Sequence, residues 1–229
     1  MIIEVWSDVV CPWCYIGKRR LERALERFEH ADEVEVVWRS YQLNPRAAPI
    51  AEGRYVDRLA RKYGVSVEQA LAMNERVTRI AEDEGLDYRF DLARYGNTRD
   101  AHRLIHLARE FGLQGAVKER LLSAYLTEGE PIGDRATLVR LVAEVGLDAS
   151  DAAAMLESDR FVADVLADRA EAEELGITGV PFFLVGRKAA VPGAQDVDTM
   201  LLILERAWTK LHAPPVGSAP GATDSTTGR

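Results

Sequence analysis

Residues 7–17 of the chain read SDVVCPWCYIG and place its two cysteines three positions apart. The preceding stretch, residues 2–7, reads IIEVWS and is apolar and rich in β-formers, which predicts a strand. Pro12 suits the first turn of a helix, where its missing N–H costs nothing. Helical spacing then predicts a helix over residues 12–29, with one apolar face made by Ile16, Leu21, Leu25 and Phe28. The cysteine pair therefore lies where a strand leads into the N-terminus of a helix.

That position predicts thiol–disulfide chemistry for Cys11 and Cys14. Two intervening residues on a first helical turn bring the sulfurs within bonding reach, and exchange needs a nucleophilic thiolate and a resolving thiol. Unpaired N–H groups and the helix dipole lower the pKa of such a cysteine from about 8.5 to roughly 3.5–7.5. We expect Cys11 to attack and Cys14 to resolve. Trp13, between them, is expected to be partly exposed and to contact the substrate.

Two other roles for the cysteines were weighed. A structural disulfide over so short a loop would constrain the unfolded chain very little. The simpler alternative to a catalytic pair is two buried structural thiols. A zinc site would need two further ligands, for which His102 and His106 are candidates because they lie four positions apart. We predict no metal, and expect one histidine on the helix surface and the other partly buried.

A second motif, TGVPFF at residues 178–183, stands after a helix and before a strand. A cis Val180–Pro181 bond is predicted here, although most X–Pro bonds in folded proteins are trans. It would turn the backbone toward the cysteines and leave the Val180 N–H and C=O free to pair with an extended substrate. Val180 and Pro181 are therefore predicted to bind substrate.

The rest of the chain predicts an α/β fold with a long helical insert. A second strand is expected at 34–41, and two short strands and a helix at 182–185, 188–191 and 196–211. Between them, helical patterns occupy 54–63, 66–84, 98–111, 115–127, 134–145, 150–157 and 160–175. Without the insert the order is βαβ followed by ββα, the thioredoxin plan.

This order predicts a discontinuous organisation. Residues 1–52 and 176–212 are expected to form the thioredoxin-like domain, and residues 53–175 the helical insert domain. Residues 213–229 hold almost no large apolar side chains, which predicts a disordered tail.

The composition excludes several classes of partner. The chain has 29 basic and 37 acidic residues, a net charge of −8, which disfavours nucleic acid and anionic membranes as partners. The N-terminus lacks the pattern of a signal peptide, and no apolar run is long enough to span a membrane. A cytoplasmic location is expected.

On these residues the chain resembles the DsbA-like thioredoxin superfamily, and in particular its cytoplasmic FrnE-type branch. The segment 7–17 is similar to the active-site region of that branch, and further similar segments are NTRDAHR at 97–103, GVPFF at 179–183 and GAQ at 193–195. The resemblance covers residues 1 to about 211. It implies a redox-active cysteine pair, a cis proline, and an insert that lies over the active site and helps form the substrate groove.

The implied function is a DsbA-like protein disulfide oxidoreductase or isomerase that exchanges disulfides with proteins, peptides or small thiols, with glutathione open as reductant or co-substrate. The alternative is a glutathione-dependent isomerase or transferase of the 2-hydroxychromene-2-carboxylate isomerase type. Such relatives carry serine at the place of Cys11 and a Ser-Asp pair near the last helix, where this chain reads Ala194-Gln195-Asp196. A zinc-stabilised or chaperone-like binding module is a third hypothesis.

Two polar positions near these motifs are expected to have structural roles. Asn97-Thr98 is expected to cap the following helix. Asp8 is expected to be a solvated or N–H-bonded turn residue.

Overall fold

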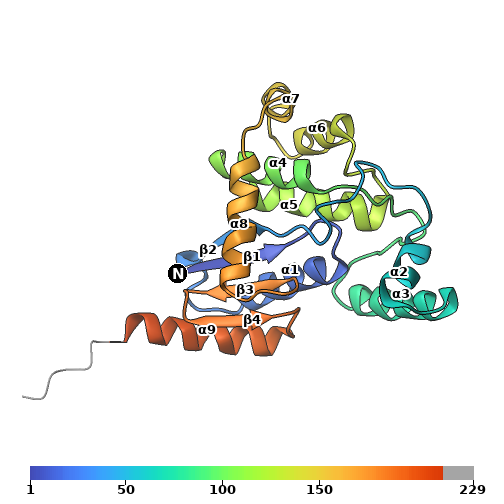
Figure 1. The fold of residues 1–229 in the computed structure, drawn as a ribbon. Helices are drawn as coiled ribbons and strands as arrows, with labels where there is room; N and C mark the ends of the chain where they lie inside the picture. The colour runs from blue at the N-terminus through green and yellow to red at the C-terminus, as the bar shows by residue number, and fades with distance from the viewer. Residues whose placement is uncertain (214–229) are drawn as a thin grey trace, which may run out of the picture.

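The computed structural model describes residues 1–213, and the predicted tail lies outside the described residues from position 214 onward. Its centre is a four-stranded sheet of order β2-β1-β3-β4 (Figure 1). The strands are β1 (Ile2–Ser7), β2 (Glu35–Ser40), β3 (Phe182–Val185) and β4 (Ala189–Pro192). β1 runs parallel to β2 and antiparallel to β3, which pairs antiparallel with β4. This confirms the predicted α/β thioredoxin-like fold.

The two faces of the sheet are covered by different helices, because alternate side chains of a strand point to opposite faces. Ile3 and Val5 join the large apolar core together with residues of α1 (Pro12–Leu25) and α9 (Val197–His212). Trp6 packs instead against Ala172 of α8 (Val162–Glu174), which crosses the sheet in Figure 1.

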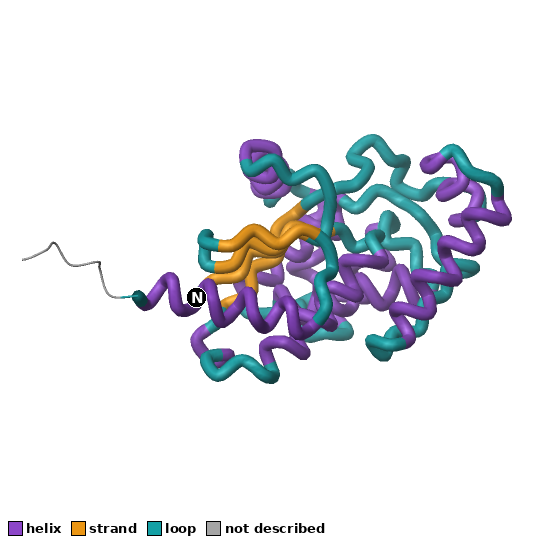
Figure 2. Tube along the Cα trace, turned by 90° about the horizontal axis from the view of Figure 1, so that it is seen from below, coloured by secondary structure: helices purple, strands orange, loops and turns teal. Residues whose placement is uncertain are grey.

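The predicted insert lies between β2 and β3 and is helical. It comprises α2 (Tyr55–Tyr63), α3 (Val67–Glu82), α4 (Arg99–Glu110), α5 (Gln114–Ser123), α6 (Arg135–Ala143), α7 (Ala149–Glu157) and α8. The α2–α3 pair stands apart from α4–α7 (Figure 1), and Figure 2 shows helices both above and below the strands. Within residues 1–213, no helix combines the length and apolarity needed to cross a bilayer.

The helix predicted over 115–127 differs from the structure at its C-terminal end. Regular α-helix ends at Ser123, and the chain continues as a π-helical turn, Ala124–Glu128, before Gly129 takes a left-handed conformation with φ 71°. Tyr125 in this turn is fully buried, and its hydroxyl has no hydrogen-bond partner among the described residues. Apolar spacing in the sequence does not distinguish the π-helical turn from a continued α-helix, because the two bury similar sets of side chains.

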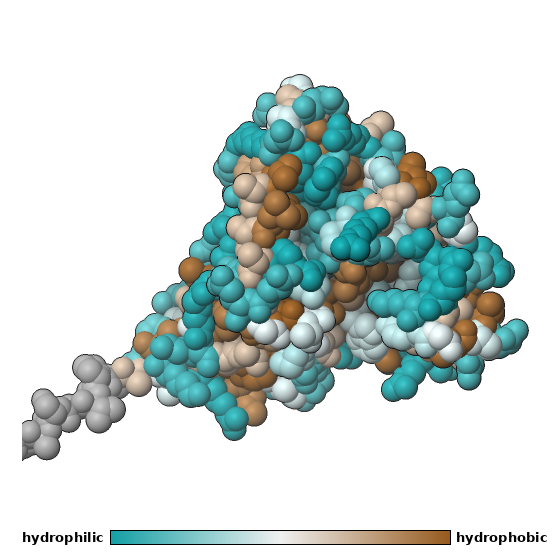
Figure 3. Space-filling model, viewed as in Figure 1, coloured by the Kyte–Doolittle hydropathy of each residue, from teal (hydrophilic) through white to brown (hydrophobic). Residues whose placement is uncertain are grey.

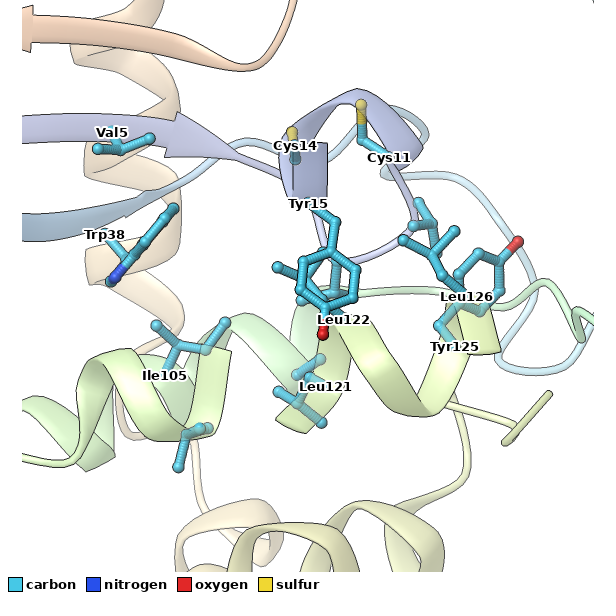
Figure 4. Packing of buried hydrophobic residues seen from close by; sticks show 14 of the residues in the cluster. Val5, Cys11, Cys14, Tyr15, Trp38, Ile105, Leu121, Leu122, Tyr125 and Leu126 are labelled. Carbon is cyan, nitrogen blue, oxygen red and sulfur yellow. The ribbon is translucent and has the colours of Figure 1, made fainter. Parts of the chain in front are cut away.

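Helix α5 closes the free edge of β2 through one side chain. The Gln114 amide accepts a hydrogen bond from the Trp38 N–H and donates one to the Trp38 carbonyl, both at 3.0 Å. The amide thus supplies a donor and an acceptor to an edge strand whose outer backbone groups would otherwise lack partners. Figure 4 shows apolar side chains of α1 and α5, among them Tyr15, Leu121 and Leu122, packed beneath the cysteine turn.

Candidate active site

The first turn of α1 carries both thiols. Cys11 is the N-cap residue, with extended backbone dihedrals of φ −93° and ψ 114°, and Pro12 occupies the first helical position as predicted. Both cysteines are free and buried, with 5% of Cys11 and 1% of Cys14 exposed. Their sulfurs lie on the same side of the turn (Figure 4).

The two thiols differ in acidity. The pKa of Cys11 lies below its ordinary value, chiefly because of the hydrogen bond from the Cys14 thiol, with further help from the N–H groups of Cys14 and Trp13. Burial and the Asp8 carboxylate oppose this lowering. Burial raises the pKa of Cys14 well above the usual value, and the adjacent Cys11 adds to the effect. Cys11 is therefore the thiol that ionises first, and Cys14 stays protonated beside it.

The loop before β3 meets Cys11 from the other side. The Val180–Pro181 peptide bond is cis, as the sequence predicts. The Val180 carbonyl was predicted to be free. In the structure it accepts a hydrogen bond from the Cys11 thiol at 3.6 Å. Among residues 1–213, neither the N–H nor the C=O of Val180 forms a hydrogen bond with another backbone group. Ionisation of Cys11 removes the thiol proton and releases the carbonyl.

Close approach of α1 to this loop depends on Gly17. A Cβ at this position would lie 3.0 Å from the Pro181 ring and 3.2 Å from the Phe183 ring. Such contacts are shorter than the roughly 3.5–4.0 Å at which carbon atoms pack favourably. A glycine on this face of α1 thus brings the thiols and the proline loop together.

A groove of about 590 Å³ opens beside Cys11. Its walls come from the cysteine turn, the loop after β2, helices α2 and α3, the segment 90–95 and the loop 178–180. Trp13, which is 38% exposed, and Val180 both line it, as expected for substrate contacts. Figure 3 shows apolar side chains in the hollow between the α2–α3 pair and the rest of the molecule. The further lining residues include Leu43, Tyr55, Arg58, Leu59, Lys62, Tyr63, Met73, Val77, Phe90 and Tyr95.

Asp8 connects the cysteine turn to neighbouring segments through its carboxylate. It is fully buried, accepts a hydrogen bond from the Leu43 N–H at 2.7 Å, and contacts Nε2 of His102 at 3.3 Å. Of the two settings expected for Asp8, solvated or N–H-bonded, the structure shows the second, in a buried position. Burial acts to raise the pKa of Asp8, and the hydrogen bond and charge of His102 outweigh it, so that the pKa is lowered. The carboxylate ties the turn before Cys11 to a groove wall and to the insert.

Lys118 of α5 is a buried cation near the thiols that sequence reasoning did not identify. It is 1% exposed and is in no ion pair among residues 1–213; its ammonium group lies 5.6 Å from the centre of the Trp38 ring. Burial lowers its pKa to about 8, against the opposing effects of Cys14, Asp8 and Cys11. In the sequence this residue looks like any surface lysine of an amphipathic helix.

The two histidines considered as metal ligands contact different carboxylates. His102 contacts Asp8, and His106 contacts Asp168 at 3.0 Å as well as the Ser40 hydroxyl at 3.0 Å. Within the described part of the chain, no three His, Cys, Asp or Glu side chains converge as a metal site would require. The expectation of a surface histidine is wrong, because 1% of the His102 side chain and 11% of the His106 side chain are exposed. The burial arises where α4 packs against Asp8 and the end of β2, and helical spacing alone could not reveal it.

The Asn97-Thr98 pair begins α4, as expected. Thr98 is the N-cap residue but makes no side-chain cap bond; the Asn97 amide oxygen accepts the hydrogen bond from the Arg99 N–H at 2.9 Å. The Asn97 amide nitrogen donates to the carbonyls of Pro45 and Ala47. The pair therefore joins the insert to the loop after β2.

Comparison with known proteins agrees with this geometry. A family model described as the DSBA-like thioredoxin domain matches residues 2–205. The uncharacterized protein YwbO of Bacillus subtilis is 31% identical over 199 residues, which cover 86% of this chain and 92% of that protein.

Solved structures show the same likeness. A probable DsbA oxidoreductase from Streptomyces coelicolor is 39% identical with a TM-score of 0.88, over 96% of this chain and 94% of that one. The cytosolic disulfide reductase DsbM from Pseudomonas aeruginosa, in a structure with GSH, shares the fold at 19% identity and a TM-score of 0.63, over 91% and 99% of the two chains. With a family match over nearly its whole described length and a CXXC pair at Cys11 and Cys14, the chain belongs to the DsbA-like thioredoxin-domain family of thiol–disulfide oxidoreductases.

Proposed function

We propose that this protein exchanges disulfides with the thiols of proteins, peptides or small molecules, with Cys11 as nucleophile and Cys14 as resolving thiol. The observation that carries the proposal is the contrast between two adjacent free thiols. The pKa of Cys11 is lowered and that of Cys14 is raised, and Cys11 lines a groove wide enough for a substrate. A nucleophile that ionises beside a protonated partner is what stepwise exchange needs.

In the reductive direction, the Cys11 thiolate attacks one sulfur of a substrate disulfide. A Cys11–substrate disulfide forms, and the second substrate sulfur leaves as a thiolate and takes up a proton. Cys14 then loses its proton and attacks the Cys11 sulfur, which releases the first substrate sulfur. The substrate gains two electrons and becomes a dithiol, and the Cys11–Cys14 disulfide is left on the enzyme. Oxidation of a substrate dithiol is the reverse sequence.

Val180 is placed to hold the substrate during these steps. Its backbone N–H and C=O have no backbone partner among the described residues, and the carbonyl is 3.6 Å from the attacking sulfur. An extended substrate segment can pair with such groups as an added strand. This supports the predicted substrate-binding role of Val180.

The finer assignment belongs to the same proposal. We place the protein in the FrnE-type branch, in the cytoplasm, with glutathione as a candidate reductant or co-substrate. The segments 97–103 and 193–195 support the branch, and the fold shared with DsbM is in keeping with glutathione. Separation of cell fractions with detection of the native protein would check the location.

Reduction of insulin disulfides in the presence of dithiothreitol tests the reaction. We expect turnover by the wild-type protein, none by Cys11→Ser, and trapping of a Cys11-linked mixed disulfide by Cys14→Ser, visible by mass spectrometry. Equal turnover by wild type and Cys11→Ser would overturn the proposal. Tight glutathione binding without dithiol turnover would favour the isomerase alternative instead.

A further inference from the structure

The groove beside Cys11 is positively charged although the chain as a whole carries a net charge of −8. Arg58 and Lys62 of α2 line it, and none of its lining residues is Asp or Glu. In a protein with an acidic excess, a groove lined by one sign of charge focuses the field locally and raises the concentration of oppositely charged substrates there.

Neither cation is neutralised by a carboxylate within the described chain. The Arg58 guanidinium lies 3.8 Å from the centre of the Tyr95 ring, and the Lys62 ammonium lies 5.4 Å from that of Tyr63. No ion pair within residues 1–213 involves either side chain, whereas Arg54, the N-cap residue of α2, is paired with Asp57 at 2.7 Å. The rings position the two cations but leave their charge available to an anion.

The excess of positive charge in the groove does not extend into the neighbouring cavity. A second cavity of about 580 Å³ shares Tyr55, Asn74 and Phe90 with the groove, so the two adjoin. Its lining combines three carboxylates, those of Glu75, Glu82 and Asp91, with two guanidinium groups, those of Arg54 and Arg79. Of the two cavities, the groove beside Cys11 is the one lined by cations without carboxylates, so a substrate carboxylate is attracted more strongly there.

The remaining walls of the groove are apolar and aromatic. Leu59, Met73, Val77 and Phe90 contribute the apolar surface, and Trp13 lies beside the attacking sulfur. Such walls suit an apolar or aromatic body next to the charged group, because a few placed polar groups fix orientation within a mainly apolar site.

We propose that this groove selects disulfides that carry a carboxylate close to the sulfur on an apolar or aromatic body, with Arg58 and Lys62 as specificity-determining residues. The inference rests on the exchange activity proposed above. The chemistry is unchanged: the Cys11 thiolate attacks the disulfide, the anionic thiolate leaves, and the cysteine pair supplies both electrons. The two cations hold the carboxylate while the sulfur reaches Cys11.

Two small aromatic disulfides test the selection in a rapid-mixing experiment with the fully reduced protein. The anionic probe is 5,5′-dithiobis(2-nitrobenzoic acid), and the neutral probe is 4,4′-dithiodipyridine. In Arg58→Gln/Lys62→Gln we expect the second-order rate with the anionic probe to fall by roughly tenfold or more, with the neutral probe nearly unaffected. High salt should reduce the wild-type rate with the anionic probe selectively.

Arg61→Gln is the matched control, because Arg61 lies on the same helix, is exposed and does not line the groove. It should leave both rates unchanged. Arg58→Lys should retain most of the rate with the anionic probe. An equal loss with both probes, or no loss with either, would overturn the inference.

Failure of the activity itself has a separate signature. If wild-type Cys11 reacts with the neutral probe no faster than an ordinary thiol, the exchange proposal fails. Fast neutral reaction without a charge effect ends only the inference about the groove.

Two further substrates distinguish the sources of the carboxylate. Glutathione disulfide represents a small molecule, and a cystine peptide with Glu next to each Cys represents a protein segment; the matched neutral compounds carry amides. If the acidic member is preferred in one pair only, that pair identifies whether the substrate is a small molecule or a protein segment. If it is preferred in both pairs, the groove recognises the carboxylate in either setting. Preference in neither overturns the inference.

Discussion

At the scale of single residues, the acidity of two thiols three positions apart is set by what surrounds each one. The hydrogen bond from Cys14 and the N–H groups of the helix lower the pKa of Cys11, whereas burial and the neighbouring Cys11 raise that of Cys14. Lys118 is the cation whose charge favours the Cys14 thiolate in the second step of exchange. Desolvation makes that charge matter, since interactions are weakly screened where water is excluded.

Lys118→Met should slow resolution by Cys14 more than attack by Cys11. Without the cation the pKa of Cys14 rises further, and a rise of about one unit reduces its thiolate roughly tenfold at a given pH. Release of product from a preformed Cys11-linked mixed disulfide, followed by rapid mixing across pH, measures the step. Attack by Cys11 on a neutral disulfide is the control; loss of attack alone would contradict the assignment.

The buried Asp8–His102 contact predicts how stability depends on pH. Burial is the main reason that the pKa of His102 lies below 6.5, against the opposing hydrogen bond and charge of Asp8; Lys118 and His106 lower it further. Since the unfolded chain takes up this proton near pH 6.5 and the folded chain only at lower pH, the free energy of unfolding falls as the pH drops below about 6.5. The slope contributed by this group approaches about 1.4 kcal/mol per pH unit.

His102→Gln keeps a donor for Asp8 and removes this titration. Urea unfolding between pH 7 and 5 should show a flatter pH dependence for the variant than for wild type. Asp8, whose pKa is lowered from 3.8, loses its contribution only at more acidic pH, so the two effects are separated. Identical slopes in the two proteins would contradict this origin.

At the scale of elements, the junction between α1 and the loop before β3 joins the two motifs of the site. Its contact surface consists of Gly17 on α1 and the rings of Pro181 and Phe183. The sheet register places this loop opposite the end of β1, where Trp6 pairs with Phe182. A side chain at the facing helix position would therefore crowd the loop.

Gly17→Ala should reduce exchange activity several-fold, although alanine favours helix over glycine by up to about 1 kcal/mol. The added methyl group displaces the proline loop, so the loss should appear mainly as a higher KM for an extended peptide substrate. Gly115→Ala in α5 is the control, because its Cβ would have nothing nearer than 4.0 Å. It should leave activity unchanged; an equal effect of both substitutions would exclude the proposed crowding.

At the scale of the whole molecule, one buried carboxylate connects the sheet to the insert. Asp168 of α8 accepts hydrogen bonds from the Ser40 N–H at 2.7 Å and from Arg39 at 3.1 Å, and it contacts His106 at 3.0 Å. These partners belong to β2 and α4, and the Trp6 indole of β1 donates to the Asp168 carbonyl at 2.9 Å. Asp168 thus contacts β1, β2 and α4, three elements that are distant from it in the sequence.

Asp168→Ala should lower the free energy of unfolding by about 3 kcal/mol or more, because it leaves buried partners of a carboxylate uncompensated. Chemical denaturation measures the loss. The alkylation rate of Cys11 in the folded variant should stay close to that of wild type, since Asp168 contacts neither thiol. A loss below about 1 kcal/mol would show that the partners find replacements.

Local patterns predicted much of the molecule. Apolar spacing placed the strands and most helices within a few residues, and the cysteine spacing with Pro12 placed the pair on the first turn of α1. These features depend on neighbouring residues, whose geometry is set by backbone sterics and helical periodicity. The cis bond before Pro181 was predicted from its context between helix and strand.

By itself, the sequence determined the order of the elements, the insert between β2 and β3, and the position of the two thiols at a helix N-terminus. Only the tertiary structure decided which distant side chains surround them: buried Lys118, the Asp8–His102 contact, and the cations of α2 beside the groove. Helical or strand spacing records which side of an element is apolar, but a charged residue on that side looks like a surface residue until another element covers it. Burial and charge, which set the acidity of the thiols, arise from packing between segments far apart in the chain.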